Sequence, residues 1–381
     1  MQLSDEQNLL RDSIARFVDD EYEFSRRQKI VAVEPGFSRA HWRRMAELGW
    51  LGATLPESHG GLGGGAAEMA IVMEQFGRRL VTSPYLVSVV MSGTALAEAG
   101  DEAQKSRWLP AIAEGRIVAF AEGEAPARHD PAFVETAARR DGAGYVLDGA
   151  KHLVPFASEA EAFLVSARTG GAQAQSAGIS LFLVPAKSPG VSLKPYRTHD
   201  GARAADLVLA GVRLGGDTRV GVEGEAFGAI ELALDHAAAA MCVEASGAMW
   251  AVHDQTLAYM KLRSQFGQTL GSFQALQHRI VDVYIKCQLA QSMAWDAVAA
   301  LDSADPTDRA RRVSAAKAHL AGAAMAVGKE GIQLHGGIAM TDDLAIGHYF
   351  KRLAAIAHTY GDGEYHMERF RRLSGLGGNT G

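Results

Sequence analysis

The sequence has few of the residues that several classes of protein require. Only two cysteines, Cys242 and Cys287, occur among 381 residues, which excludes a disulfide framework and a cysteine-rich metal site. Basic residues are not in excess either. Lys and Arg total 38 against 44 Asp and Glu, and a net charge of −6 argues against a dedicated nucleic-acid binder. No P-loop, His-Glu-x-x-His or Gly-x-Ser-x-Gly motif occurs, so we expect no catalytic metal and no nucleophile elbow.

The sequence also shows no pattern that predicts a leader or a membrane span. The first seven residues are polar, unlike a secretory signal peptide, so the expected location is the cytoplasm. Leu80 to Ala97 carry no charge over 18 residues, but they include Pro84, Gly93 and five Ser or Thr residues. A spanning helix is predominantly apolar, and we therefore expect a helix packed inside the protein.

The patterns that are present divide the chain into three parts. Hydrophobic residues make up 48%, enough for a large core, and the length allows two or three domains. Helical periods over 1–116 predict an N-terminal helical domain, in which Ser4 and Gln7 form a capping box. Short β-rich runs predict a small β-sandwich or barrel over 117–222, with strands near 145–147, 162–167, 179–184 and 205–209.

A helical bundle is expected over 223–381. Ala229 to Leu262 contain five charged residues in 34, and their composition favours one helix of roughly 50 Å. So few charges predict that this helix is covered on most sides, inside a bundle or at an oligomer interface. Further long helices are expected over 273–301 and 306–330.

A glycine-rich segment in the first part matches a loose nucleotide-binding fingerprint. Gly61 to Ala66 satisfy Gly-x-Gly-x-x-Ala, which binds dinucleotides when a strand precedes it and an acid follows about 20 residues later. Pro56 interrupts the expected strand, and 80–85 contain no acid. The segment is therefore interpreted as a plain glycine-rich loop.

Four segments of the last part could bind a ligand, and each also has a purely structural interpretation. Arg263 to Gly267 could simply end a helix with a cation and a glycine, and 273–278 begin the next helix. Together their arginine and glutamine could bind a pyrophosphate and a polar ring. The glycines of 332–338 either cap a helix or let backbone amides approach a ligand. The Gly-Asp-Gly turn in 360–366 precedes a short helix whose amides could hold a polar group.

In order and spacing these segments resemble the acyl-CoA dehydrogenase family of flavoproteins. Segments 47–52, 74–78 and 105–110 are similar to the family's N-terminal part, and the resemblance covers nearly the whole chain. It implies a helical domain, a small β-domain and a C-terminal four-helix bundle. It also implies a tetramer that binds FAD at subunit interfaces, with the flavin between the β-domain and the bundle.

Carried over position by position, the resemblance implies a set of cofactor residues. Arg263 lies at the pyrophosphate of a neighbouring subunit's FAD, and the other members of this adenosine-diphosphate clamp are Phe266, Gln274, Gln333, Gly336 and Gly337. The flavin residues are Phe120, Leu153, Val154 and Glu364, of which Glu364 stands where the family has a threonine. Asp235 matches an acid near the CoA side of the substrate pocket.

The chemistry implied by the resemblance is α,β-dehydrogenation of an acyl-CoA thioester. A carboxylate removes the α-proton while the β-hydrogen leaves as a hydride to flavin N5, and hydrogen bonds polarise the thioester carbonyl. Asp362 occupies the position of the family's catalytic glutamate and is one methylene shorter. Some members carry the base on the long helix instead, but that position is Ala237 here, followed by Ala238.

Departures in the β-domain keep other interpretations open. Where the family usually has Thr-Glu-Pro, this chain has Phe-Ala-Glu at 120–122 and so lacks the hydroxyl near the flavin. The family's aromatic-Ile-Thr segment is replaced by 151–155, which ends in Pro155, a residue with no hydroxyl or N–H to donate. Divergent bacterial members of this kind resemble enzymes for bulky steroid- or terpenoid-like acyl-CoA, some of them heterotetramers. We therefore expect an acyl-CoA dehydrogenase with Asp362 as base and an electron-transfer protein as acceptor. The alternatives are a flavin-holding partner subunit of a heteromer and a flavin oxidase.

Overall fold

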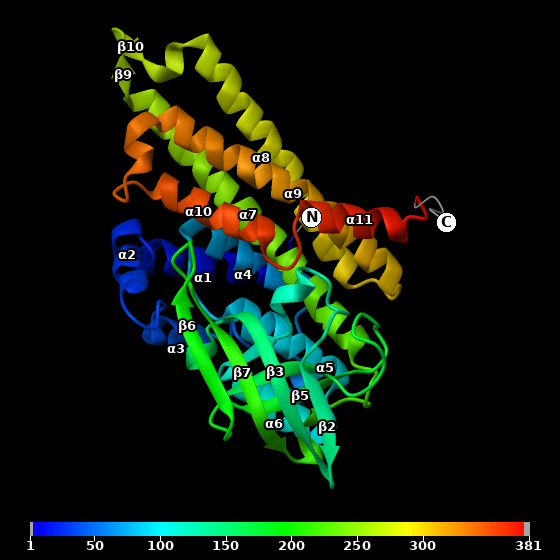
Figure 1. Cartoon of the computed structure of the whole chain (residues 1–381). Coiled ribbons are helices and arrows are strands. Elements are labelled where there is room, and N and C mark those ends of the chain that lie inside the picture. Colours follow the sequence, from blue (N-terminus) through cyan, green and yellow to red (C-terminus); the bar gives the residue numbers. More distant parts are fainter. Residues whose placement is uncertain (1–2, 377–381) are drawn as a thin grey trace. The chain divides into compact units, whose positions relative to one another are not determined.

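A computed structural model describes residues 3–376, and its elements follow the predicted order of helices, strands and helices (Figure 1). The expected fold class is confirmed: an N-terminal helical domain, a middle β-domain and a C-terminal helical domain. Chain contacts group into two compact units, which are described separately. One contains 3–29, 66–81 and 238–376, and the other contains 30–65 and 82–237.

The N-terminal third is helical, and its first helix begins where the sequence predicts. The hydroxyl of Ser4 accepts the backbone N–H of Gln7 at 3.1 Å, and the Gln7 side chain accepts the Ser4 N–H at 3.0 Å, which completes the capping box. The helices are α1 (Asp5–Glu21), α2 (Phe24–Ala32), α3 (Arg39–Glu47), α4 (Ala66–Arg79), α5 (Thr94–Ala99) and α6 (Glu102–Ala113).

From Tyr85 on, the uncharged stretch 80–97 forms the largely buried helical structure that was expected. A π-helix, η2 (Leu86–Gly93), continues directly into α5, and all but one of its residues are buried. Within residues 3–376, no helix is both long enough and apolar enough to cross a membrane.

The middle third forms one hydrogen-bonded sheet. Its strands are β1 (Val118–Ala121), β2 (Ala137–Asp141), β3 (Gly144–Pro155), β4 (Ala162–Arg168), β5 (Ile179–Pro185), β6 (Val191–Arg197), β7 (Arg203–Leu214) and β8 (Arg219–Val220). Their spatial order is β6-β7-β3-β2-β4-β5-β8, and β1 pairs with β4 in parallel. All four β-rich runs of the sequence lie in these strands, and β4 and β5 are almost entirely buried.

The last third consists mainly of long helices. Among them, α9 packs against α8, α10 and α11. They are α7 (Phe227–Leu262), α8 (Gln274–Leu301), α9 (Pro306–His335), α10 (Ala345–His358) and α11 (Gly363–Leu373). A short hairpin of β9 (Ser264–Gln265) and β10 (Gln268–Thr269) joins α7 to α8. The expected three long helices are present, and α9 runs five residues beyond its predicted end.

Helices α4 and α7 cross with their backbones in contact. A β-carbon on Gly77 would lie 2.0 Å from the carbonyl oxygen of Glu244, and one on Gly247 would lie 2.2 Å from that of Glu74. Such distances leave no room for any side chain, so both helices need glycine at the crossing. The glycine of the 74–78 motif thus has a packing role inside this unit.

We expect Gly77→Ala to lower the free energy of unfolding by about 2–3 kcal/mol, because the new methyl group meets fixed backbone atoms. The matched control is Gly322→Ala on α9, where a β-carbon meets nothing within 4 Å. Alanine has the higher helix propensity, so this control should gain up to about 1 kcal/mol. The midpoint of urea unfolding measures both variants, and equal midpoints would contradict the crossing.

Candidate functional site

Asp362 lies in a tight turn between α10 and α11 and is the N-cap of α11. Its Oδ1 accepts the backbone N–H of Tyr365 at 2.8 Å. The two preceding residues have left-handed backbones, with φ of 53° at Tyr360 and 101° at Gly361. A β-carbon on Gly361 would lie 2.3 Å from Nε2 of His366, so only glycine fits there. The turn therefore fixes the direction in which the Asp362 side chain leaves the backbone.

Glu364, the neighbouring carboxylate, has a different environment. It lies in the first turn of α11 and is exposed, whereas Asp362 is half-buried. Both carboxylates thus lie at the start of α11, but only Asp362 is fixed by a cap bond in the structure.

The ends of α7 and α9 meet, which brings together two of the segments singled out in the sequence. The Tyr259 ring, one turn before Arg263, stacks on His335 with centroids 4.5 Å apart. The buried His335 ring also contacts the Gly331 carbonyl at 2.8 Å through Nδ1. Arg263 and Gln333 are both exposed and lie at this end of the unit.

The residues of this end are open to a ligand. Phe266 is 91% exposed at the tip of the β9–β10 hairpin and has a φ of 53°, unusual for an aromatic residue. Gln274 is exposed at the first position of α8. Gly336 and Gly337 are exposed, and a β-carbon on either would meet nothing within 4 Å. A guanidinium, amide side chains and uncovered glycine backbone are groups that bind a dinucleotide.

In the β-domain, Leu153 lies at a bulge of β3. The pairing register with β7 shifts between Lys151 and Val154, and Leu153 has a φ of 54° and is 46% exposed. A leucine held in the left-handed region and turned outward is typical of a functional surface. Val154 and Phe120 are 2% and 3% exposed, so of the three flavin residues expected here only Leu153 has an accessible side chain.

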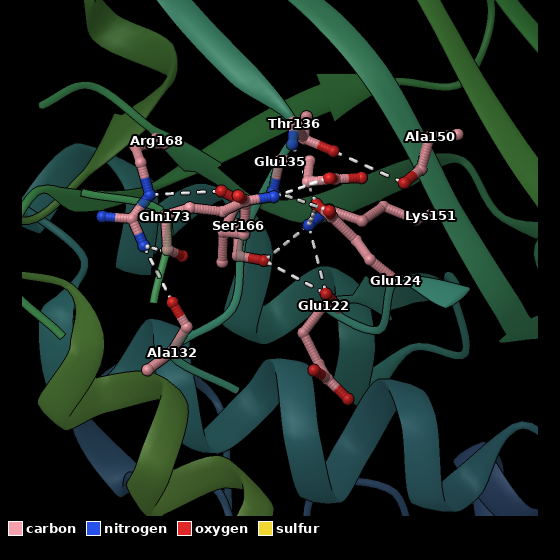
Figure 2. Close-up of polar contacts among 11 residues, drawn as sticks. Glu122, Glu124, Ala132, Glu135, Thr136, Ala150, Lys151, Ser166, Arg168 and Gln173 are labelled. Atoms are coloured by element: carbon pink, nitrogen blue, oxygen red, sulfur yellow. Dashed lines mark hydrogen bonds and ion pairs between the residues drawn. The ribbon is translucent and has the colours of Figure 1, made fainter. Parts of the chain in front are cut away.

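A buried ion pair, drawn in Figure 2, involves Lys151 at the start of this bulge. The Lys151 ammonium is wholly buried and donates to Oε1 of Glu124 at 2.7 Å, Oγ of Ser166 at 2.9 Å and the Glu122 carbonyl at 3.1 Å. Desolvation alone would raise the pKa of Glu124. The charge and hydrogen bond of Lys151 outweigh it and lower that pKa, so Glu124 stays anionic.

This pair joins the segment that follows Phe120 of β1 to β3, and Phe120, Leu153 and Val154 are the flavin residues that the resemblance implies for these two strands. Glu124 also accepts the backbone N–H groups of Glu135 and Thr136, at 2.7 and 3.0 Å. Nearby, Arg168 donates to the carbonyls of six loop residues, two of which, Ala132 and Gln173, are drawn in Figure 2. Sequence reasoning missed these residues, because a lysine in a strand normally predicts an exposed side chain.

Asp235, the expected substrate contact, is 1% exposed within α7. Its carboxylate faces the protein interior, and a contact with substrate stays a prediction. Ala237 and Ala238 are also buried, so the alternative position for a base offers only methyl groups.

Comparison with known proteins decides the family. The domain descriptions of acyl-CoA dehydrogenases match residues 4–116 (N-terminal domain), 119–212 (middle domain) and 224–373 (C-terminal domain). This chain belongs to the acyl-CoA dehydrogenase family. It is 30% identical over 365 residues to acyl-CoA dehydrogenase FadE12 of Mycobacterium tuberculosis, with 93% of this chain and 92% of that protein covered. It is therefore an oxidoreductase of acyl-CoA, and the family's cofactor is FAD, as predicted.

Two solved structures of the family are also similar. A variant of the Tcur3481–Tcur3483 steroid ACAD is 30% identical to this chain, with a TM-score of 0.88. The match covers 97% of this chain and 98% of that chain. The ChsE4–ChsE5 complex from Mycobacterium tuberculosis is 26% identical with a TM-score of 0.87, and covers 99% of both chains. Within one unit, the exposed groups at the ends of α7 and α9 offer the donors that a dinucleotide needs. Within the other unit, the β3 bulge offers an exposed apolar side chain of the kind that packs on a flavin.

We expect Leu153→Gly to make the flavin-free protein more stable while weakening FAD binding. Relief of the left-handed backbone outweighs the added chain entropy of glycine, for a net gain of about 0.5–1 kcal/mol. FAD binding should weaken because the resemblance places the Leu153 side chain against the flavin, and the variant lacks that apolar group. Urea unfolding of the flavin-free protein and FAD titration measure the two effects.

The control is Leu193→Gly on β6, where the backbone is not left-handed and glycine should only destabilise. Loss of stability in both variants would show that the Leu153 backbone is not strained.

Proposed function

We propose that this chain catalyses α,β-dehydrogenation of an acyl-CoA thioester with Asp362 as the base. The observation that carries the proposal is the turn before α11, which holds one half-buried carboxylate in a fixed direction. Asp362 takes the α-proton, and the electron pair left on the α-carbon forms the double bond while the β-hydrogen leaves with its own pair. FAD supplies the acceptor of this hydride, N5 of the flavin.

The position of Asp362 at a helix N-terminus suits a base. The cap bond orients the carboxylate, and an ionised carboxylate is the form that accepts a proton. Gly361 and Gly363 flank the residue, and Gly361 adopts the left-handed backbone that keeps the turn in its shape.

Asp362→Asn tests the base without removing the cap, because asparagine caps helices as well as aspartate does. We expect the variant to bind FAD and acyl-CoA normally, and flavin reduction to fall by about 10²–10⁴-fold. The measurement is anaerobic bleaching of the flavin absorbance by an acyl-CoA. The control is Glu368→Gln, which removes an exposed carboxylate of the same helix and should leave bleaching unchanged.

Asp362→Glu separates reach from capping. A glutamate restores the length of the family's base, so bleaching should be kept or raised, while the poorer cap lowers stability by about 1 kcal/mol. Bleaching at the native rate in Asp362→Asn would sink the assignment and direct attention to Glu364. Bleaching that appears only when a related subunit is added would support the partner-subunit function instead.

For the cofactor, we propose two groups of residues. Arg263 pairs with the pyrophosphate through charge-assisted hydrogen bonds, and the residues that complete this clamp are Phe266, Gln274, Gln333, Gly336 and Gly337. Leu153 packs on the flavin, and the further flavin contacts are Phe120, Val154 and Glu364. The exposure of Arg263, Phe266 and Leu153 supports this division. The domain boundaries proposed with it are 1–116, 117–222 and 223–381.

The substrate proposed is a bulky acyl-CoA, of the steroid or terpenoid kind, and the electron acceptor is an electron-transfer protein. Similarity to the steroid ACAD at 30% identity supports the bulky acyl group. Asp235 is the proposed contact on the CoA side.

We further propose that the chain assembles into a tetramer, with itself or with a related subunit. The sequence suggested the charge-poor helix 229–262 as one place for an interface, but most of 237–252 is buried within the chain. An exposed apolar stripe lies on α8 instead, where Val281, Tyr284, Ile285 and Leu289 are 44–53% exposed. Their spacing places them on one face of the helix, opposite its buried face.

The double change Val281→Asp and Leu289→Asp should dissociate the assembly, because it places two charges in an apolar interface. Sedimentation velocity at micromolar concentration measures the state. Leu9→Asp, at a side chain that is 71% exposed on α1, is the control and should leave it unchanged. A native chain that sediments as a stable FAD-loaded monomer would contradict the proposal.

A further inference from the structure

Lys317 is a buried lysine in the middle of α9 that the proposed chemistry does not use. It is 1% exposed, and its ammonium donates to the carbonyls of Ile356 at 2.9 Å and Gly361 at 2.7 Å. Ile356 belongs to the last turn of α10, and Gly361 directly precedes Asp362. One ammonium thus ties the end of α10 to the turn that carries Asp362.

The same turn is held at each of its residues. The carbonyl of Tyr360 lies 2.9 Å from Nε2 of His366, Gly361 accepts from Lys317, and Asp362 accepts the N–H of Tyr365. Two successive left-handed residues, the first of them a tyrosine, would not keep their shape without such contacts. Of these bonds, the one from Lys317 comes from another helix.

The titratable groups around the ammonium come from three other elements. Asp362 in the turn is the charge that acts on Lys317 directly. The Cys242 thiol on α7 is neutral beside it, because burial raises the pKa of that thiol, and His366 and Arg369 of α11 contact Ser314, one turn earlier on α9. Burial lowers the pKa of Lys317 to about 8, so the ammonium is charged at neutral pH beside Asp362.

A buried charge that donates to carbonyls is costly compared with an apolar side chain of the same length. Methionine would fill the same volume without that cost. The lysine is therefore better explained by what it holds than by packing alone.

We propose that Lys317 is a positioning residue for Asp362. The Lys317 ammonium clamps the turn through the Ile356 and Gly361 carbonyls and places a positive charge beside the carboxylate that meets the α-proton. This inference rests on the proposed function of Asp362. Lys317 itself touches neither substrate nor cofactor in this scheme.

The test compares Lys317→Met with Lys329→Met, which removes an exposed lysine of the same helix. In FAD-loaded Lys317→Met, the acyl-CoA affinity should stay within about 3-fold of native, while the rate constant of flavin reduction falls about 10–100-fold. The acid limb of its pH profile, measured below the Lys317 pKa, should move up by about one unit, because the carboxylate loses a neighbouring positive charge. Lys329→Met should behave as the native protein.

Lys317→Arg restores the charge and should return the acid limb toward its native position, even if its larger head slows the reaction. A lysine with a purely structural role would give a different result. In that case FAD content and stability would fall together in Lys317→Met, while the acid limb of the remaining FAD-loaded enzyme would stay at its native position. That result would overturn the inference. If Lys317→Met does not load FAD, the acid limb of Lys317→Gln decides by the same criterion.

Asp362→Asn measured in parallel separates the two claims. Native flavin reduction in Asp362→Asn would show that the base is wrong. Loss of reduction in Asp362→Asn together with a native rate and pH profile in Lys317→Met would show that only the role of Lys317 is wrong.

Discussion

The backbone contact between α4 and α7 is the constraint on which the surrounding helices depend. Because glycines line the crossing, the two helices meet without a side chain between them. The neighbouring helices α8 and α10 form hydrogen bonds to residues of α4 and α7 close to this crossing. Tyr349 of α10 donates to the Arg78 carbonyl, and Arg352 of α10 binds both oxygens of the buried Glu244. Gln291 of α8 donates to Glu74 at 3.2 Å. Helix α10, which leads into the Asp362 turn, is therefore anchored at the crossing.

The features that resemble a working site are those where the chain departs from relaxed geometry. Leu153 and Phe266 are exposed apolar residues in the left-handed region, and Tyr360 adopts it next to Asp362. Two of the three are supported by ordinary bonds: the Lys151–Glu124 pair lies at the bulge of Leu153, and Lys317 donates to the turn that follows Tyr360. Strain of this kind persists only where surrounding contacts determine it, and it occurs also at the buried Leu80 and Phe156, so here exposure as well as strain distinguishes Leu153 and Phe266.

Local signals in the sequence predicted local structure well. The capping box at Ser4, the long helices and the four β-rich runs depend on neighbours in the chain, and all are confirmed. The sequence motifs also sufficed for the family. The contacts that support the site were out of reach, since Lys317 and Gly361 are 44 residues apart and nothing local marks a buried lysine as a clamp. The low charge of α7 predicted a helix covered inside a bundle or at an interface, and α7 is buried within the chain, whereas the exposed apolar face on α8 was not predicted.

The central claim is that Asp362 takes the α-proton of an acyl-CoA thioester. A crystal structure of the FAD-loaded protein with a non-reducible acyl-CoA analogue tests it most directly, because the distance from each carboxylate to the α-carbon can be read from it. The account predicts an Asp362 oxygen within about 3.5 Å of the α-carbon, on the face opposite the flavin. The account would be contradicted by a complex in which Glu364, or a carboxylate of another subunit, occupies that place. In such a complex Asp362 would still cap α11 but would lie far from the α-carbon.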